Sequence, residues 1–578
     1  MNASDPRLPK LCGTDVEVGN FICGVERAAG SGAEASRALL REIEGYPQAR
    51  TNHSCLSAWT GGHHGWSGRY GMRAREQDST AVGTCVPDTA GSGRVLAIAP
   101  FYNAGLPASA YDRQDWGRKF LANGSCAYID LDHLELASAE TLSAYDQLAC
   151  VHALLRVARA ALTAANARQP RGQRLQVLVN NSDGSGRSYG SHLNMLLSRV
   201  AWNTIFERKV HYLLYLAAFQ TSSIVFTGQG KVGSENDAPP VRYQISQRAD
   251  FFETLTGPQT TCRRPIVNSR DEPLCGLGRG PYYSSPTDDK ARLHVIFYDS
   301  TLCHVATLLK LGTLQIVLAM IEAGNVDASL ILDDPLDAVV RWSHDPTLQA
   351  RARLVDGTET TAAELQARFV EAARAFVEDG GCEGIVPRAG DIVVLWEDTV
   401  DRLLARDLDA LVPRLDWVLK MSILDRAIAQ RPGLGWSSPQ VKHLDHVYSS
   451  LDLDEGLYWA YERAGLVERL VSEERVSWLV EHPPECTRAW TRGMLLRQAG
   501  AAGVEDANWD WVRIASTGRG GWRIPRTIHL ADPLAWDQTR AAEVFDDHSD
   551  LGEIADRLDA MVSEAHGPTE RRSSDGRA

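Results

Sequence analysis

Three sets of acidic residues could hold a metal ion or move protons. A period of two residues along predicted strands gives the members of a set a common face. Hard cations such as Mg²⁺ prefer oxygen ligands, and nucleotide phosphates often complete their shell. With nearby arginines, the sets predict an ATP–Mg²⁺ site, although each acid alone is more typical of a solvated surface residue. The sets are Asp15 with Glu17; Asp130 with Glu135 and Glu140; and Asp271 with Glu272, beside Arg270.

Other motifs of nucleotide or nucleophilic chemistry are incomplete or absent. The glycine-rich run 228–233 lacks P-loop spacing, because Val232 follows Lys231 where Ser or Thr would be needed. We therefore expect a glycine-rich turn there. The sequence has no G-x-S-x-G and no H-E-x-x-H. His63 and His64 have no other His or Cys at ligand spacing, which favours a polar loop tip over a metal site.

Composition excludes several classes of protein. The 578 residues carry a net charge of −14, which argues against a general nucleic-acid binder, because phosphate backbones are bound by basic surfaces. No run reaches the length of apolar sequence that spans a bilayer, so no membrane association is expected. The N-terminal segment lacks an apolar signal core, and the 11 cysteines form no C-x-x-C pair. We expect a reduced, cytoplasmic chain.

Hydrophobic periodicity predicts the elements that must position the acids. In a strand pair at 127–136, Tyr128, Asp130 and Asp132 fall on one face. The strand 175–180 ends in a polar loop at 181–189. The other expected strands are 14–19 and 292–299, and the expected helices are 34–44, 139–165, 305–323 and several across 361–430.

Composition also predicts the domain organisation. Residues 1–430 form the main domain, in which 46–118 is a long insertion dense in Gly, Ser, Pro and Thr. The Arg431-Pro432-Gly433 turn predicts a boundary, after which 431–535 form a small C-terminal domain. The polar remainder, 536–578, is expected to be a disordered tail.

Six ordered motifs resemble the Pup ligase and Dop (deamidase of Pup, depupylase) family. The likeness runs from about residue 11 to 515, and the order of the motifs makes it far more specific than any one of them. The matching stretches are 13–17 (G-x-E-x-E), 123–135 (NGARLYVD and HPE), 180–194 (NN-x-D…SYG-x-HEN), 243–249 (LSQRA), 268–273 (TRDEPH) and 293–300 (LHVI-x-GD), followed by C-terminal likeness at 444–458 and 483–493. Ser188 to His192, 454–458 and the insertion lean to the Dop side.

The resemblance implies a fold and a reaction. The fold is α+β and glutamine-synthetase-like: a curved antiparallel β-sheet forms a cradle backed by helices, with a small C-terminal domain. ATP (or ADP and phosphate) and Mg²⁺ are the implied cofactors, bound in the cradle. The family acts at a glutamate-type carboxylate or carboxamide and forms or hydrolyses amide and isopeptide bonds through an acyl-phosphate-type mechanism. Phosphorylation gives a carboxylate a leaving group, and a base then activates amine or water.

The resemblance also implies roles for individual residues. Asp130 matches the catalytic base or nucleophile. The metal-site positions are Asp15, Glu17, Tyr128, Glu135 and His192. The candidates for ATP or phosphate binding are Arg248, Arg270, His294, Arg488 and Trp511. A core tryptophan is an equally good interpretation of Trp511.

The sequence departs from the family at several of these motifs. The family Arg of NGARLY is Cys126, the Glu of HEN is Leu193, the His of RDEPH is Leu274, the Gly before Asp299 is Tyr298, and a following Glu is His304. Loss of a metal ligand or a cationic clamp weakens a phosphoryl-transfer site. These substitutions therefore predict either an altered substrate or lost chemistry.

Three interpretations remain open. The chain is an active Dop-type enzyme with Pup or a Pup-like peptide as partner. Alternatively, it is an active amide-forming or amide-hydrolysing enzyme for another substrate, such as a small molecule or carrier peptide. In the third interpretation it is a catalytically impaired relative that binds a peptide or partner. Retention of Asp130, Glu135, His192, Arg270 and His294 favours activity.

Overall fold

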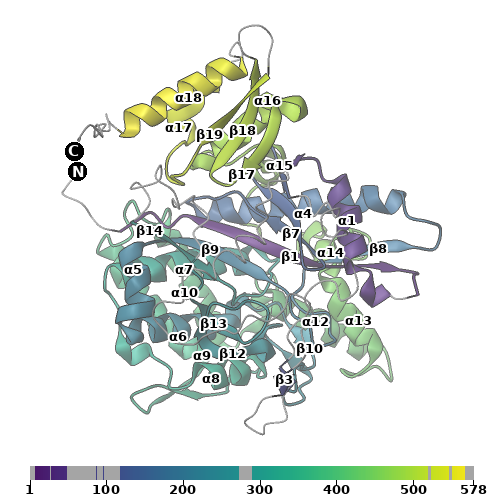
Figure 1. The fold of residues 1–578 in the computed structure, drawn as a ribbon. Helices are drawn as coiled ribbons and strands as arrows, with labels where there is room; N and C mark the ends of the chain where they lie inside the picture. Colours follow the sequence, from purple (N-terminus) through teal and green to yellow (C-terminus); the bar gives the residue numbers. More distant parts are fainter. Residues whose placement is uncertain are drawn as a thin grey trace.

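The fold combines one large antiparallel sheet with many helices (Figure 1). This computed structural model describes residues 7–26, 28–47, 118–271, 289–517, 523–545 and 550–566, together with the short strands β3 (Val86–Pro87) and β4 (Val95–Leu96). The expected α+β class is confirmed. Most of the insertion 46–118 and the position Leu274 lie outside the described residues.

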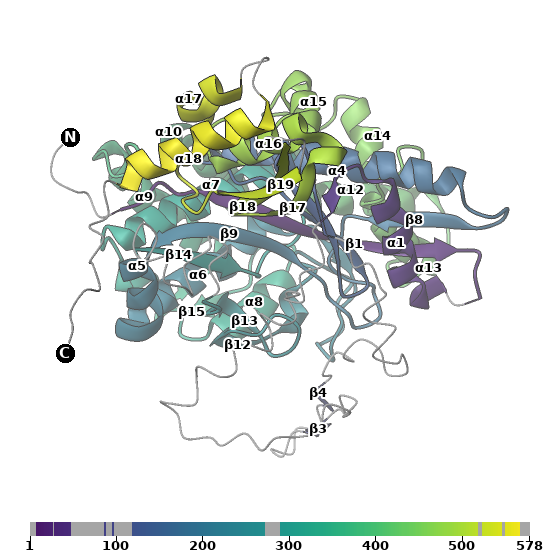
Figure 2. The same cartoon turned by 45° about the horizontal axis from the view of Figure 1, so that its top comes forward.

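The large sheet is built around β1 (Cys12–Cys23). Its first half pairs with β9 on one side and β7 on the other, and its second half pairs with β8. Figure 2 shows β1 and β9 side by side as a curved layer. The other strands are β2 (Tyr46–Pro47), β5 (Lys119–Phe120), β6 (Cys126–Asp130), β7 (His133–Ala137), β8 (Arg174–Leu178), β9 (Ser191–Ser198) and β14 (Lys290–Val295), in the order β14-β9-β1-β7-β6-β5-β2.

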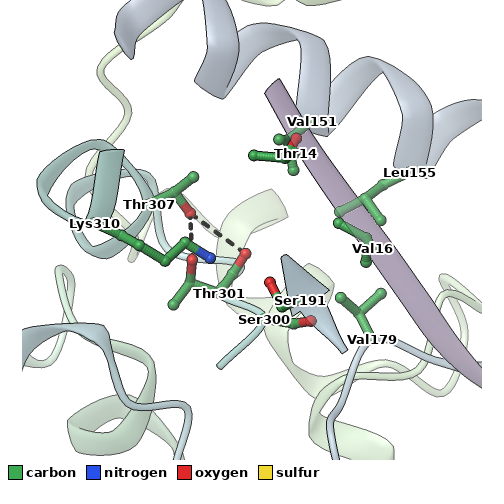
Figure 3. A pocket seen from close by; sticks show the side chains of 10 residues that line it. All are labelled: Thr14, Val16, Val151, Leu155, Val179, Ser191, Ser300, Thr301, Thr307 and Lys310. Atoms are coloured by element: carbon green, nitrogen blue, oxygen red, sulfur yellow. Dashed lines mark hydrogen bonds between the residues drawn. The ribbon is translucent and has the colours of Figure 1, made fainter. Parts of the chain in front are cut away.

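Alternation along β1 separates two environments. Thr14 and Val16 face the helices, where they line a small pocket with Lys310 (Figure 3). Asp15 and Glu17 lie on the opposite face, which we call the cradle face. One strand thus supplies both core packing and chemistry.

The helical layer packs against the face of the sheet opposite the cradle. Its central helix, α7 (His304–Glu322), contacts β9, α4 (Ala144–Ala167) and α10 (Ala389–Ala405), and nearly all of its residues are buried. The other helices of the main body are α1 (Gly32–Glu42), α5 (Arg199–Asn203), α6 (Val210–Thr227), α8 (Pro335–Ser343), α9 (Ala362–Glu378), α11 (Leu408–Leu411), α12 (Asp416–Gln430), α13 (Pro439–Tyr448), α14 (Leu457–Arg463) and α15 (Glu473–Glu481). Short strand pairs join them: β10 (Lys231–Val232) with β11 (Tyr243–Gln244), β12 (Phe252–Gly257) with β13 (Arg264–Asn268), and β15 (Ala352–Arg353) with β16 (Glu359–Thr360).

Two described helices are long and apolar enough to cross a membrane. They are α4 and α7, and the apolar windows concerned are 67% and 100% buried inside the molecule. A helix that is apolar on all sides is also the usual form of a core helix. Both are therefore weak indications of a membrane span.

A smaller unit has a second hydrophobic core. It contains α16 (Arg488–Gly503), the three-stranded sheet β17 (Val504–Asn508), β18 (Trp511–Thr517) and β19 (Arg523–His529), and the helices α17 (Gln538–Ala541) and α18 (Leu551–His566). Phe120, Cys126 and Ala137 of the large sheet belong to the same core. The small unit therefore continues the packing of the β5–β6–β7 edge.

Two expectations about domains are corrected. The turn at 431–433 does not separate the cores, because Tyr448, Tyr458 and Trp459 are buried in the main one. The C-terminal part of the second core begins with Trp490. Residues 538–566 were expected to be disordered, yet they form helices, and Ile554 of α18 is fully buried. Apolar residues spaced along α18 cover β18 and β19.

Candidate active site

Strand register assembles the predicted acidic residues on the cradle face. Directly opposed residues in an antiparallel pair share a face. Glu135 on β7 lies opposite Glu17 on β1 and opposite Tyr128 on β6. Asp15 lies opposite His192 on β9. Four neighbouring strands thus bring all five predicted metal-site residues to one surface.

Four carboxylates on this surface form a cluster. Ligand atoms of Asp15, Glu135 and His192 lie within 4.8 Å of one another, and so do those of Glu17, Asp130 and Glu135. We call Asp15, Glu17, Asp130 and Glu135 the carboxylate cluster. Glu17 and Glu135 are buried. Protonation or a counter-cation relieves the repulsion of like charges this close, and oxygen donors suit a hard divalent ion, so the residues present fit Mg²⁺.

The electrostatics of the cluster follow from its burial. Loss of hydration raises the pKa of Asp15, Glu17 and Glu135, and neighbouring carboxylates raise the pKa of Glu135 further. Asp130 is at the exposed end of β6, where restricted hydration and the charge of Glu17 raise its pKa to about 6. Asp130 is therefore poised to change protonation near neutral pH.

Two histidines form a wall beside the cluster. The rings of His192 and His294 have centroids 4.9 Å apart, and His192 Nε2 lies 4.0 Å from Glu17 Oε1. Burial lowers the pKa of both rings, and nearby arginines lower it further. Both imidazoles are therefore neutral at physiological pH, the state in which a ring nitrogen can accept a proton or bind a metal ion.

Asn194 connects Asp15 to two side chains of β14, Arg292 and His294. Asn194 donates to Asp15 Oδ2 over 2.8 Å and accepts from Arg292 Nη1 over 2.8 Å. His294 Nδ1 lies 3.1 Å from the same Asn194 oxygen. These contacts orient Asp15 and bring Arg292 into the site. Arg292 is two residues from His294 on one strand, and this spacing could have indicated it.

Two arginines, Arg248 and Arg264, lie near Glu17 of the cluster. Arg248 is 1% exposed and donates from Nη1 to the Tyr189 carbonyl, and its Nε has no hydrogen-bond partner among the described residues. Burial lowers the pKa of Arg248 to about 9. Arg264, which sequence reasoning missed, donates to the Ser188 carbonyl. An unsatisfied buried guanidinium N–H beside the carboxylate cluster fits an anionic ligand such as phosphate.

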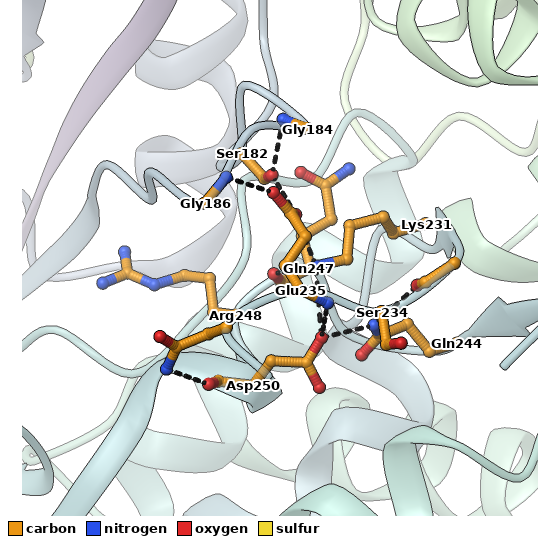
Figure 4. A network of polar contacts seen from close by, with 12 residues as sticks. Ser182, Gly184, Gly186, Lys231, Ser234, Glu235, Gln244, Gln247, Arg248 and Asp250 are labelled. Atoms are coloured by element: carbon orange, nitrogen blue, oxygen red, sulfur yellow. Dashed lines mark hydrogen bonds and ion pairs between the residues drawn. The ribbon is translucent and has the colours of Figure 1, made fainter. Parts of the chain in front are cut away.

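Figure 4 shows how the loop between β8 and β9 is anchored. The Ser182 hydroxyl and the Gly186 N–H both donate to Glu235, which pairs with Lys231 at 2.7 Å. Lys231 also lies 3.5 Å from Asp250. This buried network fixes the loop that leads directly to His192. The glycine-rich turn expected at 228–233 therefore has a structural role here.

Gly190 lets the backbone approach the cluster. A Cβ added there would lie 2.3 Å from His192 Nε2 and 2.7 Å from Glu17 Oε1. The Gly190 carbonyl also accepts from the Glu17 N–H over 3.2 Å. Glycine is thus required by close packing at this point.

A pocket opens next to Asp15, between the sheet and the small unit. Its volume is about 590 Å³ including the mouth, and Asn194, Arg292, Arg488 and Trp509 line it. Trp511, the predicted aromatic, lies on β18 and is not among the lining residues. Trp509 lies two positions earlier, and sequence reasoning missed it. Its arginines and its tryptophan offer charge and an aromatic face, which are the chemical features that a nucleotide needs.

Arg488 has a structural partner inside the molecule. Its Nε donates to Glu140 over 2.7 Å, and its Nη1 donates to the Leu530 and Ala531 carbonyls. Arg492 binds the same carboxylate at 2.6 Å. The two guanidinium groups outweigh the effect of burial and lower the pKa of Glu140 to about 2. This arrangement joins the small unit to the strand end after β7. A role of Arg488 in phosphate binding stays a prediction.

The remaining predicted residues fall into two groups. Arg270 follows β13 and lies close enough to His192 and His294 to lower their pKa values. Among the substituted positions, Cys126 is buried on β6, two residues before Tyr128 and therefore on the cradle side. Leu193, Tyr298 and His304 are buried in the main body. Leu193 points away from the cradle, because its neighbours His192 and Asn194 point into it.

Comparison with known proteins identifies the family. The family described as Pup-ligase protein matches residues 13–514. The depupylase of Acidothermus cellulolyticus is 37% identical over 427 residues, which cover 74% of this chain and 80% of the relative. The Pup–protein ligase of Acidimicrobium ferrooxidans is 35% identical over 432 residues, which cover 74% and 89%. The chain belongs to the Pup-ligase protein family, as the motifs predicted.

Solved structures agree with the fold. The Pup ligase PafA in complex with ADP gives a TM-score of 0.62 at 25% identity and covers 82% of this chain and 98% of that chain. The complex of Pup and its ligase PafA gives a TM-score of 0.68 at 22% identity and covers 97% and 93%. Relatives named as depupylases and as ligases are similar to this chain by nearly equal amounts. That this chain is closer to the Dop enzymes than to the Pup ligases therefore stays a prediction.

Proposed function

We propose that this protein is an ATP- and Mg²⁺-dependent cytoplasmic enzyme that acts at a glutamate-type carboxylate or carboxamide of Pup or a Pup-like peptide. It forms or hydrolyses an amide or isopeptide bond. The carboxylate cluster carries the proposal, because four acids from three strands converge on one point of the cradle face. Family relatives named as depupylases and as Pup–protein ligases support the reaction class.

Asp130 is the proposed base or nucleophile. It is the exposed member of an otherwise enclosed cluster, so a peptide end can reach it. A carboxyl with a pKa of about 6 is largely ionised at neutral pH, yet it binds a proton more readily than an ordinary aspartate. It can therefore accept the proton of an attacking amine or water, or attack a carbonyl itself.

The other side chains of the site have proposed roles in binding Mg²⁺ and the phosphate groups. Asp15, Glu17, Glu135 and His192 would hold Mg²⁺, with the Tyr128 hydroxyl next to them. Arg248, Arg270 and His294 would bind phosphate oxygens, because they face the same cluster. When bound, the nucleotide and Mg²⁺ supply activation of the carboxylate and neutralisation of its developing charge.

A mass assay tests the proposal. The chain is incubated with ATP, Mg²⁺, a primary amine as acceptor and Pup peptides that end in Glu or in Gln, and ADP and peptide mass are followed together. Release of ADP with a phosphorylated or amidated Glu peptide indicates a ligase. Conversion of Gln to Glu without net ATP use indicates a hydrolase. If neither change occurs and calorimetry detects no nucleotide binding, the proposal is overturned in favour of a peptide-binding relative without catalysis.

A further inference from the structure

The cradle face carries a further cation, Arg118, which none of the motifs indicated. Arg118 directly precedes β5, and β5 pairs with β6. The Arg118 guanidinium carbon is 4.1 Å from the centroid of the Tyr128 ring. Tyr128 in turn lies opposite Glu135 of the carboxylate cluster. The guanidinium therefore lies over the Tyr128 ring, at the β6 side of the cluster.

The charge of Arg118 reaches several members of the site. It lowers the pKa of Asp15 and of Asp130, which lie on different strands. It also acts on Cys126, whose thiol is buried and has a pKa raised to about 12, so that it stays neutral. Position 126 shares the cradle side with Tyr128 and contributes no charge there. Arg118 supplies positive charge to the part of the site where Cys126 supplies none.

The position over an aromatic face favours a guanidinium, whose positive charge is attracted to the ring. The group is planar, and its N–H donors point outward in its own plane. From that plane it can bind two oxygens of one phosphate at once. A lysine could supply the charge without this geometry. The placement of Arg118 therefore suits a phosphate held beside a metal ion better than a general role in neutralising carboxylates.

We propose that Arg118 binds the phosphate groups of the nucleotide and replaces the cationic side chain that this chain lacks at position 126. The inference rests on the proposed function, because it assumes that a nucleotide binds in the cradle. It adds a binding residue from outside the recognised motifs. It also explains how the site keeps a cation at this edge although Cys126 is neutral.

Calorimetry with Mg²⁺–ADP tests the inference in the full chain. Arg118→Ala is expected to weaken nucleotide binding about tenfold to a hundredfold, the usual effect of losing a charged hydrogen-bonding group. The nucleotide affinity of Arg118→Lys is expected to lie between that of Arg118→Ala and that of the unaltered chain, because lysine keeps the charge and loses the planar fork. The matched control is Arg388→Ala, which removes a guanidinium stacked 3.6 Å from the Tyr145 ring outside the cradle. That control should bind as the unaltered chain does.

A second measurement separates phosphate binding from a structural role. Titration with Mg²⁺ alone should give equal or tighter binding in Arg118→Ala, because a cation that repels the ion has gone. A collapsed site would instead lose affinity for both ligands.

The failures are distinguishable. If Arg118→Ala binds Mg²⁺–ADP as tightly as the unaltered chain, this inference is wrong and the proposed function stands. If Arg118→Ala loses Mg²⁺ and nucleotide together, Arg118 supports the fold and the inference is also wrong. If the unaltered chain binds no nucleotide, the proposed function fails and takes the inference with it.

Discussion

Among the four acids of the carboxylate cluster, Asp130 is the one that is exposed to an incoming substrate. It is exposed at the end of β6 while its neighbours Glu17 and Glu135 are buried. We predict that Asp130→Asn abolishes turnover, because an amide is neither a base nor a nucleophile at neutral pH. The fold should be unchanged, because the amide has nearly the same shape. Peptide mass and thermal unfolding, measured on one preparation, check both parts.

A control distinguishes catalysis from general loss of charge. Asp132→Asn changes a carboxylate in the turn after β6, outside the carboxylate cluster. It should keep turnover within a few-fold of the unaltered chain. Turnover that persists in Asp130→Asn would show that another residue is the base.

The carboxylate cluster also makes stability depend on pH. The folded-state pKa of Asp130 rises from its ordinary 3.8 to about 6, and those of Asp15, Glu17 and Glu135 rise too. A raised carboxyl pKa adds stability below its ordinary value, and this stability is lost as pH rises through the folded value. Mg²⁺ binds the ionised form and should offset that loss. Without metal, we predict that this contribution to the free energy of unfolding falls between about pH 4 and 7.

Thermal unfolding with excess Mg²⁺ or with EDTA tests this expectation. EDTA should lower the melting temperature more at about pH 7.5 than at about pH 5, because the cluster is more ionised at the higher pH. Ca²⁺ offers a comparison with a larger hard cation. An equal effect of EDTA at both pH values would contradict metal binding by the cluster.

Within elements, strand alternation decides which substitutions touch the site. Leu193 stands where the family has Glu, yet it is fully buried between His192 and Asn194 and faces the core. We predict that Leu193→Glu, which restores the family residue, destabilises the fold by several kcal/mol and adds no metal affinity. Leu193→Met should cost less than about 1.5 kcal/mol. Chemical denaturation and Mg²⁺ titration measure the two effects, and a gain in metal affinity would contradict the assignment.

Alternation also explains how far the sequence predicted the site. It placed Asp15 with Glu17, and Tyr128 with Asp130, because each pair lies on one strand. It left the two-residue spacing of Arg292 from His294 unused, and it missed Trp509, because the approach of Trp509 to Asp15 depends on docking of the small unit. Such contacts join residues far apart in sequence, and no local pattern records them.

At the scale of the whole molecule, one ion cluster joins the small unit to the sheet. Glu140 accepts from Arg488 and Arg492, and all three are nearly fully buried. We predict that Glu140→Gln destabilises the fold by about 3–5 kcal/mol, because two buried guanidinium groups lose their counter-charge. The contribution of Glu140 is present above its ordinary pKa of 4.5 and is lost as pH falls toward its folded pKa of about 2.

Denaturation by urea measures this effect. The control is Asp337→Asn, which breaks the exposed pair with Arg341 and should cost about 1 kcal/mol or less. A comparable loss in both variants would show that burial of the Glu140 cluster adds nothing to its strength.

The general class of the fold was predictable, and the limits of its two cores were not. The family motifs indicated a sheet, helices and a small C-terminal unit, and the structure has all three. The turn at 431–433 is a strong local signal, yet Tyr448 and Trp459 beyond it complete the main core. Composition detects a turn, whereas the boundary of a core depends on which surfaces meet in three dimensions.

The two faces of β1 have a consequence for how this gene can change. Thr14 and Val16 serve the core while Asp15 and Glu17 serve the cradle, and the same strand pairs with β7, β8 and β9. Insertion or deletion of one codon within β1 would exchange the two faces, moving acids into the core and apolar groups into the cradle. Point changes can be absorbed one at a time, but the length of this strand is fixed.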